Sequence, residues 1–371
     1  MIRLTIPSIE EDDLQAVREI LESGFLVQGV KVVEFEKIVA KYTGAKHAIA
    51  VSNCTAALHL SLLSLNIGVG DFVAVPSYSW IATANVVELC GAHPIFVDID
   101  PQTFNMSTHH LESVLKNITT NPETSYQLKA ILPVHIFGET ADMMVINELA
   151  KHYHIPVIED AACALGASHN GKKAGTWGNI GCFSFHPRKA VTTGEGGVII
   201  TDDDQVAYRL RVLRNHGQDC LEFIMPGFNY RITEFQAALG ITQMSKLERI
   251  IKARRHSATI YDHLFIDTPV KIQAVLPGNR HIYQSYTILL PEEINRYEMI
   301  LYLKGRGVET TIGTIHMPMT VYYRTHYGFK VGDFPCTDRI ARRSLTLPLY
   351  EKLTEEEQQQ IVEAVLEGLK Q

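Results

Sequence analysis

The chemistry of this chain centres on residues 181–197, which read GCFSFHPRKAVTTGEGG. The apolar residues 182–185 predict a short strand, and residues 198–201 predict a second one. Between them lie Lys189 and a glycine-rich turn, with the hydroxyl of Ser184 five residues before the lysine. An ε-amine can form a Schiff base with an aldehyde, and burial gives the amine the lowered pKa that this reaction needs. On this segment alone, a surface turn with a solvated lysine is the better interpretation, so the rest of the chain must be weighed.

The length and composition limit the classes of protein to which this chain can belong. The 371 residues suffice for two domains, or for one large α/β domain with an appendage, and 46% hydrophobic with 20% charged residues is typical of a globular chain. A net charge of −7 argues against a nucleic-acid binder, and no segment approaches the ~18 apolar residues of a membrane span. Six cysteines without a CxxC pair, and no apolar signal segment in residues 1–13, predict a cytoplasmic protein with reduced thiols.

Apolar runs and helical periodicity alternate along most of the chain. Further strands are predicted at residues 47–51, 72–76, 94–97, 129–134 and 156–159. Helices are predicted at residues 9–23, 32–43, 55–65, 81–90, 108–116, 143–153 and 204–214. This alternation is typical of an α/β fold with a mainly parallel sheet covered by helices.

The pattern changes in the last third of the chain. A long helix is predicted over residues 233–255, with 257–264 as a continuation. Later strands (282–290, 308–311) and helices (297–305, 337–344, 354–369) predict a smaller α+β domain. We place a large domain at residues 1–245 and a small C-terminal domain at residues 246–371.

Polar groups follow several predicted strands, at the sheet edge where ligands bind in open parallel sheets. Thr55 and Ala56 open a helix and could hold a phosphate, although Thr55 could equally be an ordinary N-cap. Asp160 could keep a pyridinium nitrogen protonated or could cap a helix. Trp80 could stack on a ring or pack in the core. With Lys189 these groups suit a phosphorylated pyridine aldehyde.

Ten segments of the sequence occur in an order that carries a resemblance to a known family. They are residues 23–29 (SGFLVQG), 55–60 (TAALHL), 76–78 (PSY), 133–135 (PVH), 158–162 (IEDAA), 183–189 (FSFHPRK), 192–197 (TTGEGG), 214–217 (RNHG), 227–231 (GFNYR) and 347–350 (LPLY). The chain resembles the DegT/StrS family of PLP-dependent sugar aminotransferases nearly from end to end. The resemblance implies the type I aspartate-aminotransferase fold.

The resemblance also implies catalytic and cofactor-binding roles. Lys189 is then the Schiff-base lysine and afterwards the base that moves a proton between the substrate carbon and the cofactor. Asp160 pairs with the pyridine nitrogen of pyridoxal 5'-phosphate (PLP). Thr55, the Ala56 backbone and Ser184 hold the phosphate.

Other positions are expected to serve the ring, the substrate and a second subunit. Trp80 stacks on the cofactor ring. Asn229 reaches the phosphate of the neighbouring subunit's cofactor, and Arg231 approaches the substrate, so a homodimer with composite active sites is expected. His316 lies in a loop that resembles the family's His/Pro loop at the mouth of the site, or is a packed loop histidine.

The chain departs from the family pattern at three positions. Cys54 replaces a glycine that is common before the threonine of the phosphate loop. Cys163 stands where many members have Gln or His beside the ring. Arg188 precedes the lysine and could bind a substrate phosphate or carboxylate, or form an ion pair facing solvent.

The function implied by the resemblance is amino transfer to a keto sugar. An amino acid, expected to be L-glutamate, would convert PLP to pyridoxamine phosphate (PMP), which would aminate a keto sugar expected to be nucleotide-linked. The product would serve amino-sugar and surface-polysaccharide biosynthesis, lipopolysaccharide included. A non-nucleotide substrate, such as a keto-octulosonate or a cyclitol, is the alternative.

Other functions agree less well with the sequence. A PLP- or PMP-dependent sugar dehydratase would have His in place of Lys189, and a catalytically silent regulator would not need the lysine together with Asp160 and Thr55. No metal site is expected, because the adjacent His109 and His110 have no third ligand nearby. The absence of a GxGxxG motif after a first strand argues against an NAD enzyme.

Overall fold

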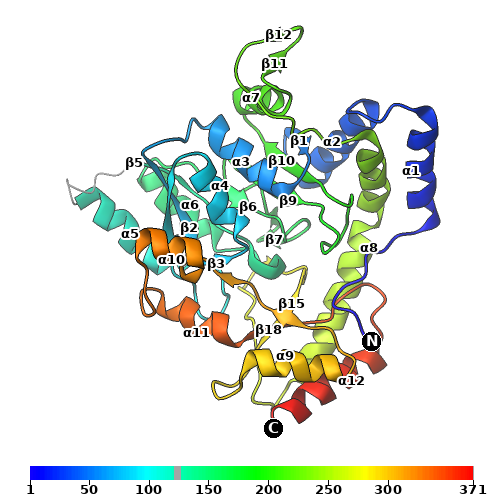
Figure 1. Cartoon of the computed structure of the whole chain (residues 1–371), viewed down its shortest axis with the longest axis vertical. Coiled ribbons are helices and arrows are strands. Elements are labelled where there is room, and N and C mark those ends of the chain that lie inside the picture. The colour runs from blue at the N-terminus through cyan, green and yellow to red at the C-terminus, as the bar shows by residue number, and fades with distance from the viewer. Residues whose placement is uncertain (121–126, 371) are drawn as a thin grey trace.

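The computed structural model describes residues 1–120 and 127–370, and a mainly parallel sheet lies at its centre (Figure 1). A four-stranded part and a three-stranded part meet through parallel bridges from Ile131 to Val157 and from Val134 to Asp160. The strands follow the order β1 (His47–Val51), β10 (Gly197–Thr201), β9 (Ile180–Ser184), β6 (Ile158–Asp160), β5 (Gln127–Ile131), β2 (Asp71–Pro76) and β4 (His93–Val97). All run parallel except β10, which is antiparallel to both neighbours.

The two faces of the sheet carry separate apolar cores, because successive side chains of a strand point to opposite sides. In β1, Ile49 and Val51 belong to the core beneath α3, α4 and α7, whereas Ala48 and Ala50 belong to the core beneath α2 and α8. The helices around the sheet are α2 (Val30–Thr43), α3 (Cys54–Ser64), α4 (Ala82–Leu89), α5 (Thr108–Thr120), α6 (Met143–His152), α7 (Asp204–Arg214) and α8 (Glu234–Leu264).

Helix α8 carries the chain from the central sheet to a smaller antiparallel sheet (Figure 1). That sheet has the order β13 (Lys271–Ile272), β15 (Tyr286–Leu289), β18 (Ser344–Leu347) and β16 (Thr311–Ile312). The helices of the C-terminal part are α9 (Arg296–Gly305), α10 (Val321–Tyr327), α11 (Pro335–Arg343) and α12 (Glu355–Gly368). Because α8 passes unbroken through residues 245 and 246, the domain division at that point stays a prediction.

Short strand pairs join segments that are far apart in the sequence. The pair β3 (Tyr78–Ser79) and β17 (Ile315–His316) links the central sheet to the C-terminal part. A three-stranded sheet is formed by β14 (Asn279–Arg280), β7 (Ser168–His169) and β8 (Lys172–Lys173). The hairpin of β11 (Gln218–Asp219) and β12 (Glu222–Phe223) projects at the top of Figure 1.

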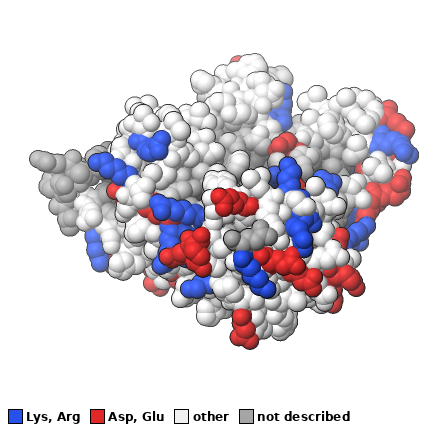
Figure 2. Space-filling model, turned by 60° about the horizontal axis from the view of Figure 1, so that its bottom comes forward, with Lys and Arg blue, Asp and Glu red and all other residues white. Residues whose placement is uncertain are grey.

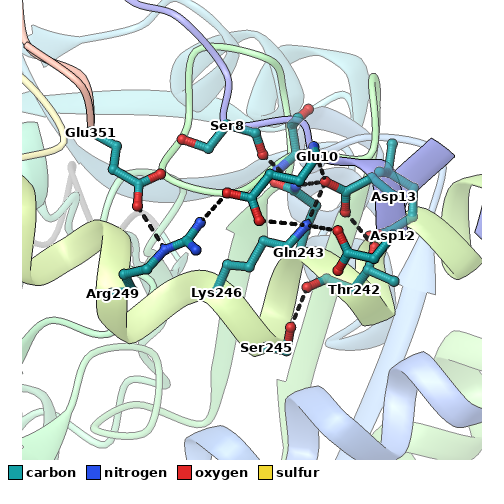
Figure 3. Close-up of polar contacts among 12 residues, drawn as sticks. Ser8, Glu10, Asp12, Asp13, Thr242, Gln243, Ser245, Lys246, Arg249 and Glu351 are labelled. Atoms are coloured by element: carbon teal, nitrogen blue, oxygen red, sulfur yellow. Dashed lines mark hydrogen bonds and ion pairs between the residues drawn. The ribbon is translucent and has the colours of Figure 1, made fainter.

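Polar contacts, rather than apolar burial, attach helix α1 (Glu11–Ser23) to α8 (Figure 3). Asp13 is the buried residue of α1, and Lys246 of α8 lies 2.6 Å from Asp13 Oδ2 and 2.6 Å from Asp12 Oδ1. Gln243 donates to Asp13 Oδ2 at 3.0 Å and to the carbonyl of Ser8 at 2.8 Å. This attachment leaves Leu14 and Leu21 more than half exposed.

Two predicted strands of the C-terminal part have only two to four residues in the structure. The segment 282–290 is a strand only at Tyr286–Leu289, because Tyr283 has a left-handed backbone (φ 49°) that interrupts the extended run. The segment 308–311 becomes a strand only from Thr311, since Val308 is occupied in a bridge with Ile2 at the start of the chain.

The surface of the C-terminal part mixes charges of both signs. Among the described residues on the face shown in Figure 2, basic and acidic side chains are interspersed, without the continuous basic field that a nucleic-acid backbone requires. Within residues 1–120 and 127–370, none of the helices combines the length and apolar character needed to cross a membrane.

Candidate active site

Asp160 ends β6 at the carboxyl edge of the sheet and is 5% exposed. The Thr83 hydroxyl donates to its Oδ2 at 2.8 Å, and the Ala162 N–H donates to its Oδ1 at 3.2 Å. Burial raises the pKa of Asp160, against these two hydrogen bonds and the nearby Lys189. A buried carboxylate of this kind needs a cationic partner, which a protonated ring nitrogen would supply.

Lys189 lies in the turn after β9, where its backbone N–H donates to the His186 carbonyl at 2.8 Å. Lys189 is half-buried as a residue, and its ammonium group donates to Cys163 Sγ at 3.1 Å. Burial acts to lower the pKa of Lys189, but Cys163, Cys54 and Asp160 outweigh it, so the net pKa is raised. The sequence predicts that burial lowers the pKa of Lys189. The pKa is instead raised because these acidic groups favour the charged ammonium.

The start of α3, which the sequence predicts to hold a phosphate, has a different N-cap residue from the one expected. The N-cap of α3 is Asn53, whose Oδ1 accepts from the Ala56 N–H at 2.8 Å. The Thr55 side chain is therefore not the cap; it lies in the first turn, is exposed, and its hydroxyl has no partner within the described chain. Of the two expected groups, the Thr55 hydroxyl is available, whereas the Ala56 N–H is already paired.

Strand β10 brings Ser184 beside this helix start. Ser184 is 8% exposed, lies opposite Gly197 in the strand pair, and accepts from the His186 N–H at 3.3 Å. A Cβ atom at Gly197 would lie 2.5 Å from the Asn53 carbonyl carbon and oxygen. Only glycine therefore allows β10 to lie this close to the start of α3. The strand pairing therefore places the Ser184 and Thr55 hydroxyls on neighbouring segments.

The remaining predicted residues lie in different surroundings. Trp80 follows β3 and is 64% exposed, and within the described chain no aromatic ring stacks on it. Asn229 is exposed, and its side chain makes no hydrogen bond to the part of the chain that the structure describes. Arg231 donates to Asn215 Oδ1, and its backbone forms a bridge with Val51 at the end of β1.

Arg188 and His316 differ in exposure and in the contacts that they make. Arg188 is exposed and forms no ion pair with any described residue. His316 Nε2 lies 3.1 Å from Asp338 Oδ1, its ring packs edge-on against Phe334, and burial lowers the pKa of the imidazole. It lines a cavity of about 640 Å³ between α9 and α11, and no contact in the described residues joins it to Lys189.

The pattern of residues at strand ends does not predict a role for Thr83, because Thr83 lies three residues beyond Trp80 and inside a helix. Its signal is a hydroxyl in the first turn of α4, on the chain segment that follows β3. Together, an amine, a buried carboxylate, a free hydroxyl at a helix start and an exposed indole fit a phosphorylated pyridine aldehyde. Among the described residues, no cluster of three or more His, Cys, Asp or Glu side chains could hold a metal ion.

Comparison with known proteins agrees with this chemistry. The model of the DegT/DnrJ/EryC1/StrS aminotransferase family matches residues 7–366. GDP-perosamine synthase from Caulobacter vibrioides is 37% identical, over 98% of this chain and 97% of that protein. A solved DegT/DnrJ/EryC1/StrS aminotransferase from Brucella abortus has a TM-score of 0.90 and 32% identity, covering 96% of this chain and 95% of that one. Helicobacter pylori PseC, an aminotransferase of pseudoaminic acid biosynthesis, has a TM-score of 0.91 and 26% identity, covering 100% and 99%.

These structures confirm the α/β fold expected from the sequence, and solved relatives include PLP and PMP forms. The chain therefore belongs to the DegT/DnrJ/EryC1/StrS aminotransferase family and is a sugar aminotransferase that depends on PLP.

Proposed function

We propose that this enzyme transfers the amino group of L-glutamate to a keto sugar that is linked to a nucleotide. The observation that carries the proposal is the convergence of Lys189, Cys163 and Asp160 beside the start of α3. The relative named GDP-perosamine synthase supports a nucleotide-linked sugar, and the product would enter surface-polysaccharide biosynthesis such as that of lipopolysaccharide.

Bound PLP supplies an aldehyde and a ring that withdraws electrons from the substrate carbon. We assign the Lys189 amine two roles, which would be to hold the aldehyde and to remove and return a proton at the substrate carbon. Asp160, which is buried, would keep the ring nitrogen protonated. The hydroxyls of Thr55 and Ser184 would bind the phosphate, and the start of α3 would add a favourable dipole.

The Ala56 N–H can join the phosphate site only by leaving Asn53, because that side chain accepts its hydrogen bond at 2.8 Å. Trp80 is exposed and free to cover one ring face. We assign Arg188, Arg231 and His316 to the sugar substrate. The assignment is best supported for Arg188, because this side chain is exposed and forms no ion pair with any described residue.

We propose a homodimer in which Asn229 reaches the cofactor phosphate of the partner subunit. The support is a set of exposed apolar side chains on α1, α2 and the loop between them, because clustered exposed apolar side chains mark interaction surfaces. Its members, each about half exposed or more, are Leu14, Leu21, Phe25, Val27, Val30 and Val33. The six unpaired cysteines support a cytoplasmic location.

The test of the transfer reaction uses purified protein and a panel of keto sugars. The protein is expected to be yellow with bound PLP, to lose that colour with L-glutamate, and to regain it when the correct sugar accepts the amino group. Mass spectrometry of the products distinguishes nucleotide-linked from free keto sugars and cyclitols. A protein that stays colourless after addition of PLP would exclude the reaction, and amination of free sugars alone would exclude the nucleotide.

A further inference from the structure

The loop that carries Lys189 is held by three glutamine side chains. We call residues 185–196, between β9 and β10, the lysine loop. Gln236 Nε2 donates to the Glu195 carbonyl at 2.7 Å, and Gln243 Oε1 accepts from the Thr192 N–H at 3.3 Å. Gln236 and Gln243 are seven residues apart in α8, so they lie on one face of that helix. The third glutamine, Gln284, acts on Lys189 most directly.

We propose that Gln284 is a positioning residue that fixes the backbone of Lys189. Its Nε2 donates to the Arg188 carbonyl at 2.5 Å, and its Oε1 accepts from the Ala190 N–H at 3.0 Å. These two groups belong to the peptide bonds on either side of Lys189, so one side-chain amide holds both. Gln284 is 7% exposed, and therefore water is a poor substitute for either bond.

Gln284 is itself held in place from several sides. Arg254, which is 2% exposed, donates to the Gln284 carbonyl at 3.1 Å and to the Tyr283 carbonyl at 3.4 Å. Tyr283 has a φ of 49°, which is unfavourable for a bulky residue. Its ring stacks on His281 with centroids 3.9 Å apart, and its N–H donates to His281 Nδ1 at 2.9 Å. Because these contacts hold Tyr283 in a strained conformation, we infer that the direction of the Gln284 side chain is important for the function of the protein.

The segment around Gln284 also packs against the loop beside Cys163. The Ile282 N–H donates to the Gly138 carbonyl at 3.2 Å, and the Ser285 N–H donates to the Phe137 carbonyl at 3.3 Å. A Cβ atom at Gly138 would lie 2.9 Å from the Gln284 nitrogen and 3.1 Å from the Cys163 carbonyl oxygen. Gly138 is therefore packed closely between the segment that carries Gln284 and the segment that carries Cys163, the hydrogen-bond partner of Lys189.

This arrangement has a consequence for the amine of Lys189. Two hydrogen-bonded peptide groups restrict the backbone of Lys189, so the amine starts from one defined position near Cys163 and Asp160. Without Gln284 the side chain would reach the same groups from several backbone conformations, and fewer encounters with an aldehyde would be productive. The inference rests on the proposed role of Lys189 as the residue that holds PLP.

The test compares Gln284→Leu with Gln358→Leu, a matched control. Gln358 is fully buried in α12 and donates to the Ser257 carbonyl at 2.7 Å, away from the lysine loop. The measurements are the thermal midpoint, hydrogen exchange of peptides covering the lysine loop in the cofactor-free protein, and the rate at which PLP attaches to Lys189. Attachment is quantified by borohydride reduction and peptide mass mapping.

Both variants are expected to lower the thermal midpoint. Only Gln284→Leu is expected to speed exchange within the lysine loop and to slow attachment of PLP, by about tenfold for the loss of two hydrogen bonds. Equal exchange and attachment rates in the two variants would overturn the proposal. Absence of PLP on Lys189 of the unmodified protein would instead overturn the proposed role of the lysine.

A second variant covers the case in which Gln284→Leu does not fold. In Gln284→Glu, a protonated carboxyl can accept from Ala190 and donate to Arg188, whereas a carboxylate cannot donate. The attachment rate of this variant, relative to the unmodified protein, is therefore expected to rise as the pH falls. A pH profile parallel to that of the unmodified protein would contradict the positioning role.

Discussion

The Thr83 hydroxyl donates a 2.8 Å hydrogen bond to Oδ2 of Asp160, across 77 residues of sequence. It determines which way the buried carboxyl group faces, because the Ala162 N–H takes the other oxygen, Oδ1, at 3.2 Å. The bond also favours the charged form of Asp160, against the rise in pKa that burial causes.

Replacing Thr83 with Val is expected to lower kcat by about 10- to 150-fold, since a hydrogen bond to a charged group contributes about 1.5–3 kcal/mol. Loss of the bond raises the pKa of Asp160 further, so the acidic limb of the pH–rate profile should move to higher pH. Kinetics over a range of pH would measure both effects. Thr83→Ser keeps the hydroxyl and serves as the control. An unchanged profile in Thr83→Val would show that the carboxyl does not depend on this bond.

Replacing Cys163 with Ala is expected to lower the pKa of Lys189. In the cofactor-free chain, burial acts to lower that pKa, but the thiol 3.1 Å away and the neighbouring acids raise it. Without the thiol, more of the amine is unprotonated at a given pH. The rate of PLP attachment near pH 8 should therefore rise roughly threefold to tenfold.

The pH dependence of PLP attachment is the measurement for Cys163→Ala. Its profile should move to lower pH relative to the unmodified protein. Cys90→Ala, at the end of α4, is the control that removes a thiol elsewhere. A shift to higher pH would mean that the thiol lowers the pKa of the amine.

Lys246 is expected to stabilise the fold through its buried contact with Asp13. The two side chains are 6% and 1% exposed. Lys246→Met leaves the Asp13 carboxylate unpaired and should cost about 3 kcal/mol of the free energy of unfolding. Lys46→Met removes an exposed pair with Asp204 and should cost less than ~1 kcal/mol. Denaturant titration measures the free energy of unfolding of both variants. Equal losses in the two variants would contradict the larger contribution of the buried pair.

The same contact predicts a loss of stability in acid. Burial alone would raise the pKa of Asp13, but hydrogen bonds from Lys246, Thr242, the Glu10 N–H and Gln243 lower it below 3.8. A carboxyl whose folded pKa is lowered contributes stability above its unfolded pKa and loses it as the pH falls through the folded pKa. The unmodified protein should therefore lose this contribution below about pH 4. Asp13→Asn should show a shallower decline over that range in acid titrations.

Mixed dimers test whether the active sites are composite. Subunits carrying Lys189→Ala and subunits carrying Asn229→Asp should each be inactive as pure dimers. If each site uses Lys189 from one subunit and Asn229 from the other, a mixed dimer has one intact site. An equal mixture after refolding should then regain about a quarter of normal activity. No recovery in mixtures shown by mass to contain mixed dimers would exclude composite sites.

Much of the central fold followed from local sequence pattern. The strand at residues 47–51 and the helix at residues 204–214 have the predicted bounds, because apolar alternation and helical periodicity are local properties. The positions of Lys189 and Asp160 at one sheet edge followed as well, since parallel strands place their carboxyl ends together. The N-cap of α3 could not be predicted from the sequence, because Asn53 and Thr55 are both good caps. The backbone geometry of the folded chain selected Asn53.

By itself, the sequence determined which chemical groups follow the strands, among them Lys189, Asp160 and Thr55. Only the tertiary structure decided what surrounds those groups. Thr83 reaches Asp160 from 77 residues away, and Gln284 reaches Ala190 from 94 residues away, while Lys189 meets Cys163 across 26 residues. Such contacts leave no periodic signal in the sequence, because they form only when separate helices and strands pack together. The protonation of Lys189 and the orientation of Asp160 therefore depend on packing between distant segments.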